Sequence, residues 1–279
     1  MRAGTLNAHA RSQSSIAVSV DGRQWVLCNA SPDIHAQIAE HPPLQPRNGV
    51  RDTGIAAILL VDGQIDHALG LLLLRERGAP LEVWTTEPVR EDLSTGLPIL
   101  KVLDSYCSVQ WNRIPIDGTA FTVPALPGIT VSALPVEGKP GPYSTHRESP
   151  RPGDNIGLLF HDQSTGRQVF YAPGLAAISA AVAGALMASG VVLVDGTFWS
   201  DDEMVQAGIS HKHARDLGHL PQSGSGGMIE ALTRLPSPKR RILIHINNTN
   251  PILDEAGPEY AQLSAAGIEV AFDGMEIES

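Results

Sequence analysis

The feature that most constrains this chain is an apolar segment that leads directly into a cluster of polar residues and then into a helical pattern. Residues 55–61 (IAAILLV) have the length and composition of a buried strand. Four polar residues follow at the end of this strand: Asp62, Gln64, Asp66 and His67. Successive strand residues alternate in direction and the following loop turns them together, so such a strand end can aim several side chains into one crevice. The sequence therefore predicts a functional site at this point.

Strand and helix patterns alternate along the rest of the chain. An Asp-Gly pair between two apolar runs predicts a β-hairpin over residues 14–30. Further strands are expected at 81–86, 109–116, 129–136, 155–162, 167–173, 191–197, 240–247 and 268–278. Helices are expected after a cap at Ser31 or Asp33 and at 67–77, 88–104, 175–189, 228–235 and 250–267. Strands with helices in each half predict two sheets flanked by helices, an α/β (αββα) fold in one domain over residues 1–279.

Charge and apolar patterning argue against two classes of protein. The formal net charge of -10 offers no concentrated basic face, so no nucleic-acid partner is expected. The longest apolar stretches are too short or too interrupted for a membrane span, and the first residues lack the apolar core of a secretion signal, so a cytoplasmic protein is predicted. Cys28 and Cys107 fit a reducing compartment and are expected to be buried as small hydrophobic residues.

The strand-end cluster resembles the metallo-β-lactamase motif His-x-His-x-Asp-His-x-x-Gly. Asp66, His67 and Gly70 match that motif, while Asp62 and Gln64 stand where its first two histidines belong. The resemblance implies the four-layer αββα sandwich of that superfamily.

A second resemblance lies in the C-terminal half. His245 ends the apolar run RRILIH, similar to the late strand-end histidine ligand of the superfamily, and His219 in the segment GHLP is similar to the step before it. The superfamily's middle histidine falls at Gly138 or Lys139 and its bridging aspartate at Pro173 or Gly174, so two ligands are lost.

The surviving ligand set is Asp66, His67 and His245. One carboxylate and two imidazoles with open positions form the facial triad of non-haem Fe(II) oxygen chemistry, although zinc with three protein ligands is an alternative. The lost ligands argue against a hydroxide held between two metals, which is the usual hydrolytic device of this fold. Taken alone, Asp66 and His67 also fit a capped helix start, and His245 also fits a hydrogen-bonded core histidine.

Colinear segments over nearly the whole chain, among them WVLCNASPDI, DGQIDHALGLL, GHLPQSG and LIHINNTNPILDE, resemble the family of pyrroloquinoline quinone (PQQ) biosynthesis protein B. The resemblance implies a cytoplasmic enzyme that uses Fe(II) to hydroxylate the tyrosine ring of a Glu-Tyr precursor of PQQ. Two alternatives stay open: a carrier that moves PQQ or its precursor toward the periplasm, and a residual metal-dependent hydrolase. A small molecule or dipeptide is the expected substrate, and a homodimer is a further expectation.

The family usually begins with a further strand and a Cys-x-Cys-x-x-Cys cluster that helps to hold a structural zinc. This chain begins after that point, with Met1, Arg2 and Ala3. Either the start of the chain is truncated or misassigned, so that the first strand is missing, or this member dispenses with that zinc. No structural zinc is expected.

Other polar residues around these motifs are candidates for supporting roles. The resemblance places His219 and Asp195 where related enzymes keep a proton donor and its partner, with a helix cap as the alternative for His219. Asp62 and Gln64 are predicted to orient metal ligands or substrate, or else to serve as loop scaffolding.

Residues 138–153 contain too many Gly and Pro residues for regular structure, and loops of that length are often functional. His146, Arg147 and Arg151 in this loop are predicted to bind a carboxylate-rich substrate, against the alternative of ordinary exposed loop charges.

Asn247, Asn248 and Asn250 near His245 favour a turn before the next helix, with an asparagine at a cap, and Asn247 is a candidate for substrate binding or ligand support. His211 and His213 have a spacing that suits a metal only if their segment is a strand, and otherwise they suggest the rim of a site.

Overall fold

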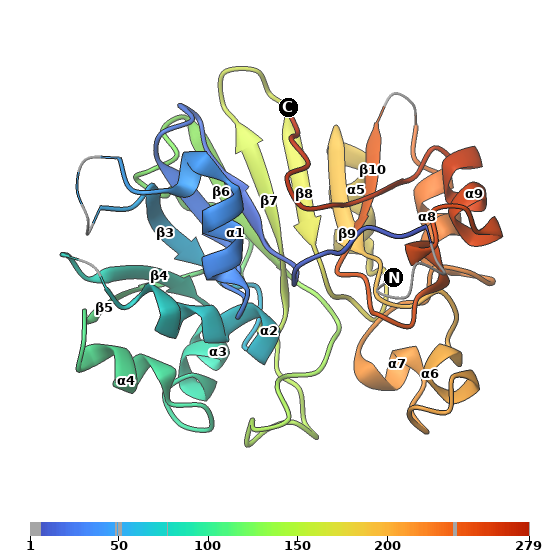
Figure 1. The fold of residues 1–279 in the computed structure, drawn as a ribbon, viewed down its shortest axis with the longest axis horizontal. Helices are drawn as coiled ribbons and strands as arrows, with labels where there is room; N and C mark the ends of the chain where they lie inside the picture. The colour runs from blue at the N-terminus through green and yellow to red at the C-terminus, as the bar shows by residue number, and fades with distance from the viewer. Residues whose placement is uncertain (1–6, 48, 50–51, 77, 237–238, 279) are drawn as a thin grey trace. The chain divides into compact units, whose positions relative to one another are not determined.

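The protein is described by a computed structural model covering residues 7–47, 49, 52–76, 78–236 and 239–278. The chain divides into two compact units. The N-terminal unit comprises Ser12–Pro135 and Lys139–Gly166, and the C-terminal unit comprises Met1–Arg11, Val136–Gly138 and Arg167–Ser279. Figure 1 shows the elements of both units in ribbon form. The single domain expected from the sequence stays a prediction, and the chain start at residues 1–6 lies outside the described residues.

The N-terminal unit holds a five-stranded sheet in the order β1-β2-β3-β4-β5. Its strands are β1 (Ile16–Val18), β2 (Trp25–Cys28), β3 (Ile55–Leu59), β4 (Leu81–Thr85) and β5 (Val109–Arg113). β1 and β2 pair antiparallel, which confirms the predicted hairpin, and the other neighbours pair parallel. β6 (Ile129–Pro135) and β7 (Ile156–Asp162) form a second antiparallel pair, in which Ile129 lies opposite Asp162.

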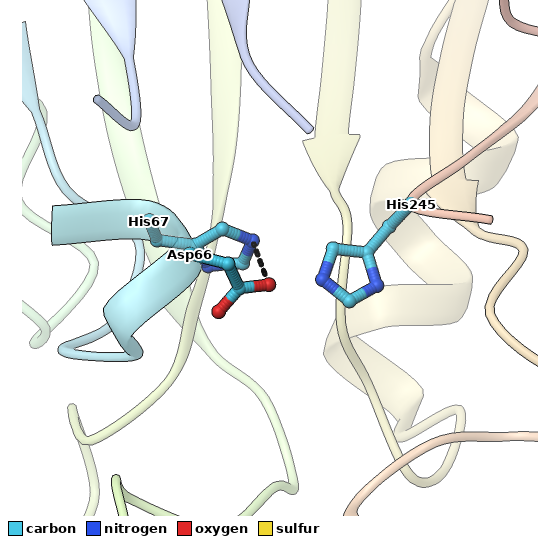
Figure 2. Close-up of side chains that lie close together, drawn as sticks. All are labelled: Asp66, His67 and His245. Carbon is cyan, nitrogen blue, oxygen red and sulfur yellow. Dashed lines mark ion pairs between the residues drawn. The ribbon is translucent and has the colours of Figure 1, made fainter. Parts of the chain in front are cut away.

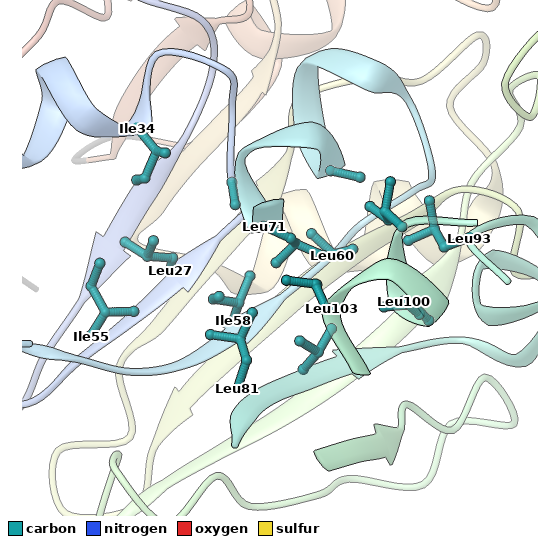
Figure 3. Close-up of a cluster of buried hydrophobic side chains, with 14 of the residues drawn as sticks. Leu27, Ile34, Ile55, Ile58, Leu60, Leu71, Leu81, Leu93, Leu100 and Leu103 are labelled. Carbon is teal, nitrogen blue, oxygen red and sulfur yellow. The ribbon is translucent and has the colours of Figure 1, made fainter. Parts of the chain in front are cut away.

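Apolar residues of strands and helices form a core in the N-terminal unit (Figure 3). Its helices are α1 (Ile34–Glu40), α2 (Ile65–Ala68), α3 (Glu87–Asp92) and α4 (Ile99–Asp104), with the 3-10 helices η1 (Pro42–Leu44) and η2 (Leu69–Leu74). Ile58 and Leu81 of the sheet, Leu93 beside α3 and Leu103 of α4 all belong to this core. Burial of each such side chain stabilises the fold by about 1.5–3 kcal/mol. Ala68 of α2 belongs to the same core, so burial also fixes the helix that follows β3.

Two long helices predicted in this unit are wrong in extent. The helix expected at 88–104 is interrupted between α3 and α4, because Pro98 lacks an N–H and disfavours helical geometry in the residue before it. The helix expected at 67–77 begins earlier, at Ile65, and tightens into the 3-10 helix η2 at Leu69. Residue 77, its predicted end, lies outside the described residues.

The C-terminal unit contains four parallel strands in the order β11-β10-β9-β8. They are β8 (Gln168–Ala172), β9 (Val191–Asp195), β10 (Arg240–Ile244) and β11 (Glu269–Val270). Every residue of β9 is buried, as its apolar run predicts for a strand covered on both faces. Asp195 at the end of β9 lies opposite Ile244 at the end of β10, so these strands deliver the residues that follow them to the same sheet edge.

The helices of this unit are α5 (Ala180–Ala188), α6 (Glu203–Gln206), α7 (Ala214–Leu217), α8 (Met228–Thr233) and α9 (Pro258–Ala265), with the 3-10 helix η3 (Pro251–Leu253). The helix predicted from residue 175 begins only at Ala180, because the backbone N–H of Leu175 donates to Asp195 and Ser179 caps α5. The prediction of one helix over 250–267 is also wrong, since the chain forms η3 and then α9, which has Pro258 in its first turn. The last strand is limited to β11.

Two expectations about the whole chain can be compared with the structure. Within the described residues, no helix combines the length and the apolar character needed to cross a membrane. Cys28 is buried as predicted, whereas Cys107 is partly exposed, so the prediction of two buried cysteines is wrong for Cys107.

Candidate functional site

His67 is held by a carboxylate at the end of β3. Its ring Nδ1 lies 2.8 Å from Asp62 Oδ1 and 2.9 Å from Asp62 Oδ2, and both residues are buried. An ionised carboxylate only accepts hydrogen bonds, so Nδ1 of His67 carries the proton and donates it. The lone pair of the neutral ring is then on Nε2, which is how carboxylates commonly orient metal-binding histidines in proteins.

Gly70 explains why α2 can lie where it does. A Cβ added at Gly70 would be 2.1 Å from the backbone oxygen of Ser31 and 2.5 Å from that of Ala30. Two backbone hydrogen bonds join these segments: Gly70 N–H donates to Ala30 O at 2.9 Å, and Ala30 N–H donates to His67 O at 2.7 Å. The glycine of the Asp-His-x-x-Gly pattern therefore permits a close backbone approach that fixes the helix carrying His67.

Asp66 precedes His67 on α2, and Figure 2 shows both side chains. Asp66 Oδ2 lies 3.8 Å from His67 Nε2, and about a third of the Asp66 side chain is exposed (35%). A single helical turn thus presents a carboxylate oxygen beside an imidazole nitrogen. Figure 2 also shows His245, which directly follows β10 in the C-terminal unit.

A polar cluster in the C-terminal unit joins Asp195, His219 and His245, each of which offers a ligand atom within 4.8 Å of the others. Asp195 is fully buried and accepts four hydrogen bonds. Its Oδ1 accepts from the N–H and the hydroxyl of Thr197, and its Oδ2 accepts from Leu175 N–H and from His219 Nδ1. A carboxylate has about four acceptor positions, so this network uses the full capacity of Asp195. Asp195 therefore suits the role of a hydrogen-bonding partner better than that of a metal ligand.

The electrostatics of Asp195 agree with that role. Burial alone would raise the pKa of its carboxyl, but the charge and hydrogen bond of His219, together with the charge of His245 and the hydrogen bond of Thr197, hold the pKa below its ordinary value. Asp195 is thus kept ionised, with His219 Nδ1 at 2.8 Å. An imidazole oriented by a buried carboxylate is a common arrangement for proton transfer.

The rings of His219 and His245 are stacked, with centroids 5.4 Å apart and planes 23° apart, and Phe198 meets His219 edge-on. His245 has a φ of 66°, a left-handed conformation that is uncommon for residues other than glycine and marks a constrained backbone. Its ring Nδ1 lies 2.7 Å from Thr197 Oγ1.

Thr197 is the residue of this cluster that the sequence analysis missed. Its hydroxyl contacts Asp195, His219 and His245. Its position in the sequence could have indicated this role. Thr197 lies two residues after Asp195 at a strand end, just as Gln64 lies two residues after Asp62.

The loop at 138–153 contains neither helix nor strand, as predicted, and its histidine makes contacts inside the N-terminal unit. His146 Nε2 lies 2.7 Å from Asp154 Oδ1, and Ser144 Oγ and Arg151 Nη2 lie 3.0 and 2.7 Å from Nδ1. Arg151 also pairs with Glu91 of α3 at 2.8 Å. These contacts stabilise the loop itself, and the predicted substrate-binding role of His146 and Arg151 stays a prediction.

Two further candidates also bind backbone carbonyls within the N-terminal unit. Arg147 donates to the carbonyl of Pro140, and Gln64 Nε2 donates to the carbonyl of Lys139 at 2.9 Å. The Gln64 contact agrees with the scaffolding alternative, because it connects the end of β3 to the loop.

The asparagines after His245 behave as turn residues. Asn250 caps η3 by accepting from Ile252 N–H at 3.1 Å, which confirms the predicted cap. Asn247 Nδ2 donates to Thr249 Oγ1 at 2.6 Å, so Asn247 supports the turn that follows His245.

The last two candidate histidines are His211 and His213. His211 and His213 are exposed and do not lie on a strand, so the condition for a His-x-His metal pair is not met. His213 instead caps α7, which ends at Leu217 with Gly218 as its C-cap, so His219 caps no helix within the described residues.

Comparisons with known proteins agree with this architecture. A family model described as the Beta-lactamase superfamily domain matches residues 24–246. The coenzyme PQQ synthesis protein B of Methylococcus capsulatus is 54% identical over 276 residues, covering 99% of this chain and 90% of the relative. The protein of the same name from Pseudomonas syringae pv. syringae is 54% identical over 278 residues, covering 99% and 91%.

Solved structures also show similarity to a protein of this kind. The crystal structure of Zn²⁺-bound PqqB from Methylobacterium extorquens has a TM-score of 0.87 and 34% identity, covering 100% of this chain and 91% of the other. A diphosphatase of the PhnP family has a TM-score of 0.67 at 19% identity, covering 99% and 88%, and is similar in fold alone. The fold class is therefore confirmed as the metallo-β-lactamase fold, with two mixed sheets flanked by helices. The chain belongs to the family of coenzyme PQQ synthesis protein B.

Proposed function

We propose that this protein acts in PQQ biosynthesis as an iron-dependent hydroxylase of the tyrosine ring of a Glu-Tyr precursor, with Asp66, His67 and His245 as the metal ligands. The part in PQQ synthesis is supported by full-length relatives of that name at 53–54% identity. The metal is supported by the Zn²⁺-bound relative and by the ligand chemistry of the three residues. The choice of iron as the metal and of tyrosine hydroxylation as the reaction is what the experiment below tests.

The observation that carries the proposal is the set of contacts made by the two imidazoles. His67 Nδ1 contacts the Asp62 carboxylate and His245 Nδ1 contacts the Thr197 hydroxyl, and a proton on each Nδ1 leaves the lone pair of the neutral ring on Nε2. Together with the Asp66 carboxylate they make the donor set of one carboxylate and two imidazoles that suits Fe(II) with open positions. The residues present therefore fit a metal, and they fit one metal better than two.

Asp195 argues against a second metal. In hydrolytic two-metal enzymes the second ion needs its own carboxylate and imidazole ligands. The acceptor capacity of Asp195 is used by four protein hydrogen bonds, and the ring of His219 is tied to it through Nδ1. We assign this pair to proton transfer at His219 Nε2, where the ring can hold or release a proton during ring hydroxylation.

Fe(II) bound by the three ligands would supply the redox chemistry that activates O₂ toward an aromatic ring. In the overall reaction one oxygen atom enters a ring C–H bond and the other leaves as water, with two electrons and two protons from an external reductant. Within this chain, Asp62 orients the imidazole of His67, and Asp195 keeps His219 in its proton-carrying orientation. Carboxylate recognition by loop arginines and a cytoplasmic homodimer stay predictions.

The experiment begins with anaerobic purification and loading with Fe(II), followed by elemental analysis. Glu-Tyr, O₂ and an added reductant are then supplied, and mass spectrometry measures oxygen incorporation. We expect one iron per chain and a product that gains oxygen from ¹⁸O₂. His67→Ala and His245→Ala should each lose iron, whereas the control His211→Ala, at an exposed position outside the cluster, should retain it.

Two results would contradict the proposal. One is intact iron binding without oxygen incorporation, and the other is full iron content in His67→Ala. The carrier alternative instead predicts tight PQQ binding that survives chelation and the His67→Ala change. The hydrolase alternative predicts metal-dependent cleavage of an ester or phosphodiester, so the same preparations separate all three functions.

A further inference from the structure

Thr197 lies at the centre of the C-terminal cluster, and the contacts of its hydroxyl show which neighbour accepts its single proton. Thr197 Oγ1 is 2.6 Å from Asp195 Oδ1, and an ionised carboxylate can only accept. The hydroxyl proton therefore points at Asp195. The two lone pairs of Oγ1 are left to accept hydrogen bonds from other groups.

The groups that donate to Oγ1 are the two histidine rings. His245 Nδ1 lies at 2.7 Å and His219 Nδ1 at 3.1 Å. His219 Nδ1 has a shorter contact, 2.8 Å to Asp195 Oδ2, so its proton is directed mainly to the carboxylate. His245 Nδ1 must carry a proton to bond an oxygen whose own proton is already donated. The neutral ring of His245 is thereby held with its lone pair on Nε2.

The backbone around Thr197 is fixed by contacts on both sides. Asn250 Nδ2 donates to the carbonyls of Gly196 and Thr197 at 3.0 and 3.2 Å, and Gln222 Nε2 donates to Gly196 O at 2.6 Å. The N–H of Gly196 donates to Ile244 O at 2.7 Å. A Cβ at Gly196 would be 2.6 Å from the Ile246 side chain, so this segment is packed directly against the chain around His245. A hydroxyl on so constrained a segment has little freedom to move away from the ring.

We propose that Thr197 is a positioning residue whose hydroxyl fixes His245 in the tautomer that presents Nε2 for metal binding. It acts through His245, much as Asp62 acts through His67, but with a neutral oxygen in place of a carboxylate. The metal part rests on the proposed function, whereas the tautomer is a property of the metal-free protein. Partners that orient a ligating imidazole typically change metal affinity roughly 10–100-fold when removed.

The test uses ¹⁵N-histidine-labelled full chain, stripped of metal, in mildly alkaline buffer where imidazoles are neutral. Long-range ¹H–¹⁵N spectra distinguish the Nδ1–H from the Nε2–H tautomer, and His245→Gln assigns the signal. We expect the Nδ1–H form in the wild type and in Thr197→Ser, which keeps the hydroxyl. Thr197→Val has nearly the same shape without the hydroxyl, and it should lose this signature.

A wild-type His245 with its proton on Nε2 would overturn the proposal, and this result does not depend on any change at Thr197. An unchanged tautomer in Thr197→Val would also overturn it. Competition against a chelating dye then measures Fe(II) and Zn(II) affinity, which should fall roughly 10–100-fold in Thr197→Val and recover in Thr197→Ser. If the tautomer follows the hydroxyl while the wild type binds no metal, the ligand assignment of the proposed function fails and the positioning by Thr197 stands.

Discussion

Replacing Gly70 with alanine should lower the free energy of unfolding and displace the helix that carries Asp66 and His67. The new methyl group would be placed 2.1 Å from Ser31 O and 2.5 Å from Ala30 O, both backbone atoms that cannot rotate away. Either α2 and η2 or the segment after β2 must move. The movement breaks or lengthens the hydrogen bonds from Gly70 N–H to Ala30 O and from Ala30 N–H to His67 O.

The magnitude follows from these two effects. Overpacking a tight site costs about 1–3 kcal/mol. Each of the two backbone hydrogen bonds contributes about 1 kcal/mol. The free energy of unfolding should therefore fall by roughly 3–5 kcal/mol, which is a large part of the 5–15 kcal/mol available to a typical domain.

Urea unfolding followed by circular dichroism measures this change, and the Fe(II) affinity of the folded variant measures the displacement of α2. The matched control is Gly184→Ala in the middle of α5, where an added Cβ meets no atom within 4 Å. That control should be unchanged or stabilised by up to about 1 kcal/mol, because alanine is the better helix former. A Gly70→Ala protein within about 1 kcal/mol of the wild type, with unchanged metal affinity, would refute the close-approach explanation of this glycine.

Three further predictions concern single side chains. Asp62→Asn removes the charge that orients His67, so metal affinity should fall roughly 10–100-fold in a competition titration; an unchanged affinity would contradict the role of Asp62. Burial raises the pKa of Asp92, so the folded state holds that proton more tightly than the unfolded state and loses stability as pH rises through the raised pKa. Asp92→Asn should accordingly be more stable than the wild type at neutral pH, with a gain that shrinks toward about pH 4, and an equal gain at both pH values would count against this explanation. Arg240→Ala breaks the partly exposed pair with Glu269, at 2.7 and 2.9 Å, and should cost about 1 kcal/mol or less in thermal or urea unfolding. A loss several times larger would show that the pair does more than join β10 to β11.

Local patterns in the sequence were enough to predict the two strands whose ends carry the candidate ligands. The run at 55–61 predicts β3 and places Asp62 and His67 just beyond it. The strand predicted at 240–247 corresponds to β10, which ends directly before His245. These predictions succeed because burial of a short apolar run depends mainly on the residues within it. The fold class followed from the same alternation together with the family resemblance.

Element boundaries were less predictable. The break before α4 follows from a local property of Pro98 that the helical periodicity of the segment does not reflect, whereas the start of α5 depends on Asp195 accepting from the N–H of Leu175. Periodicity in a single segment carries no information about a hydrogen bond to a residue 20 positions away.

The sequence by itself identified the candidate metal ligands: a carboxylate and two imidazoles at strand ends. The tertiary structure decided the state of those groups. It placed Asp62 against His67, filled the acceptor positions of Asp195, and brought the Thr197 hydroxyl to His245, 48 residues away in the chain. The physical reason is that a residue's chemical type is local, whereas its protonation, tautomer and orientation depend on neighbours that only folding supplies.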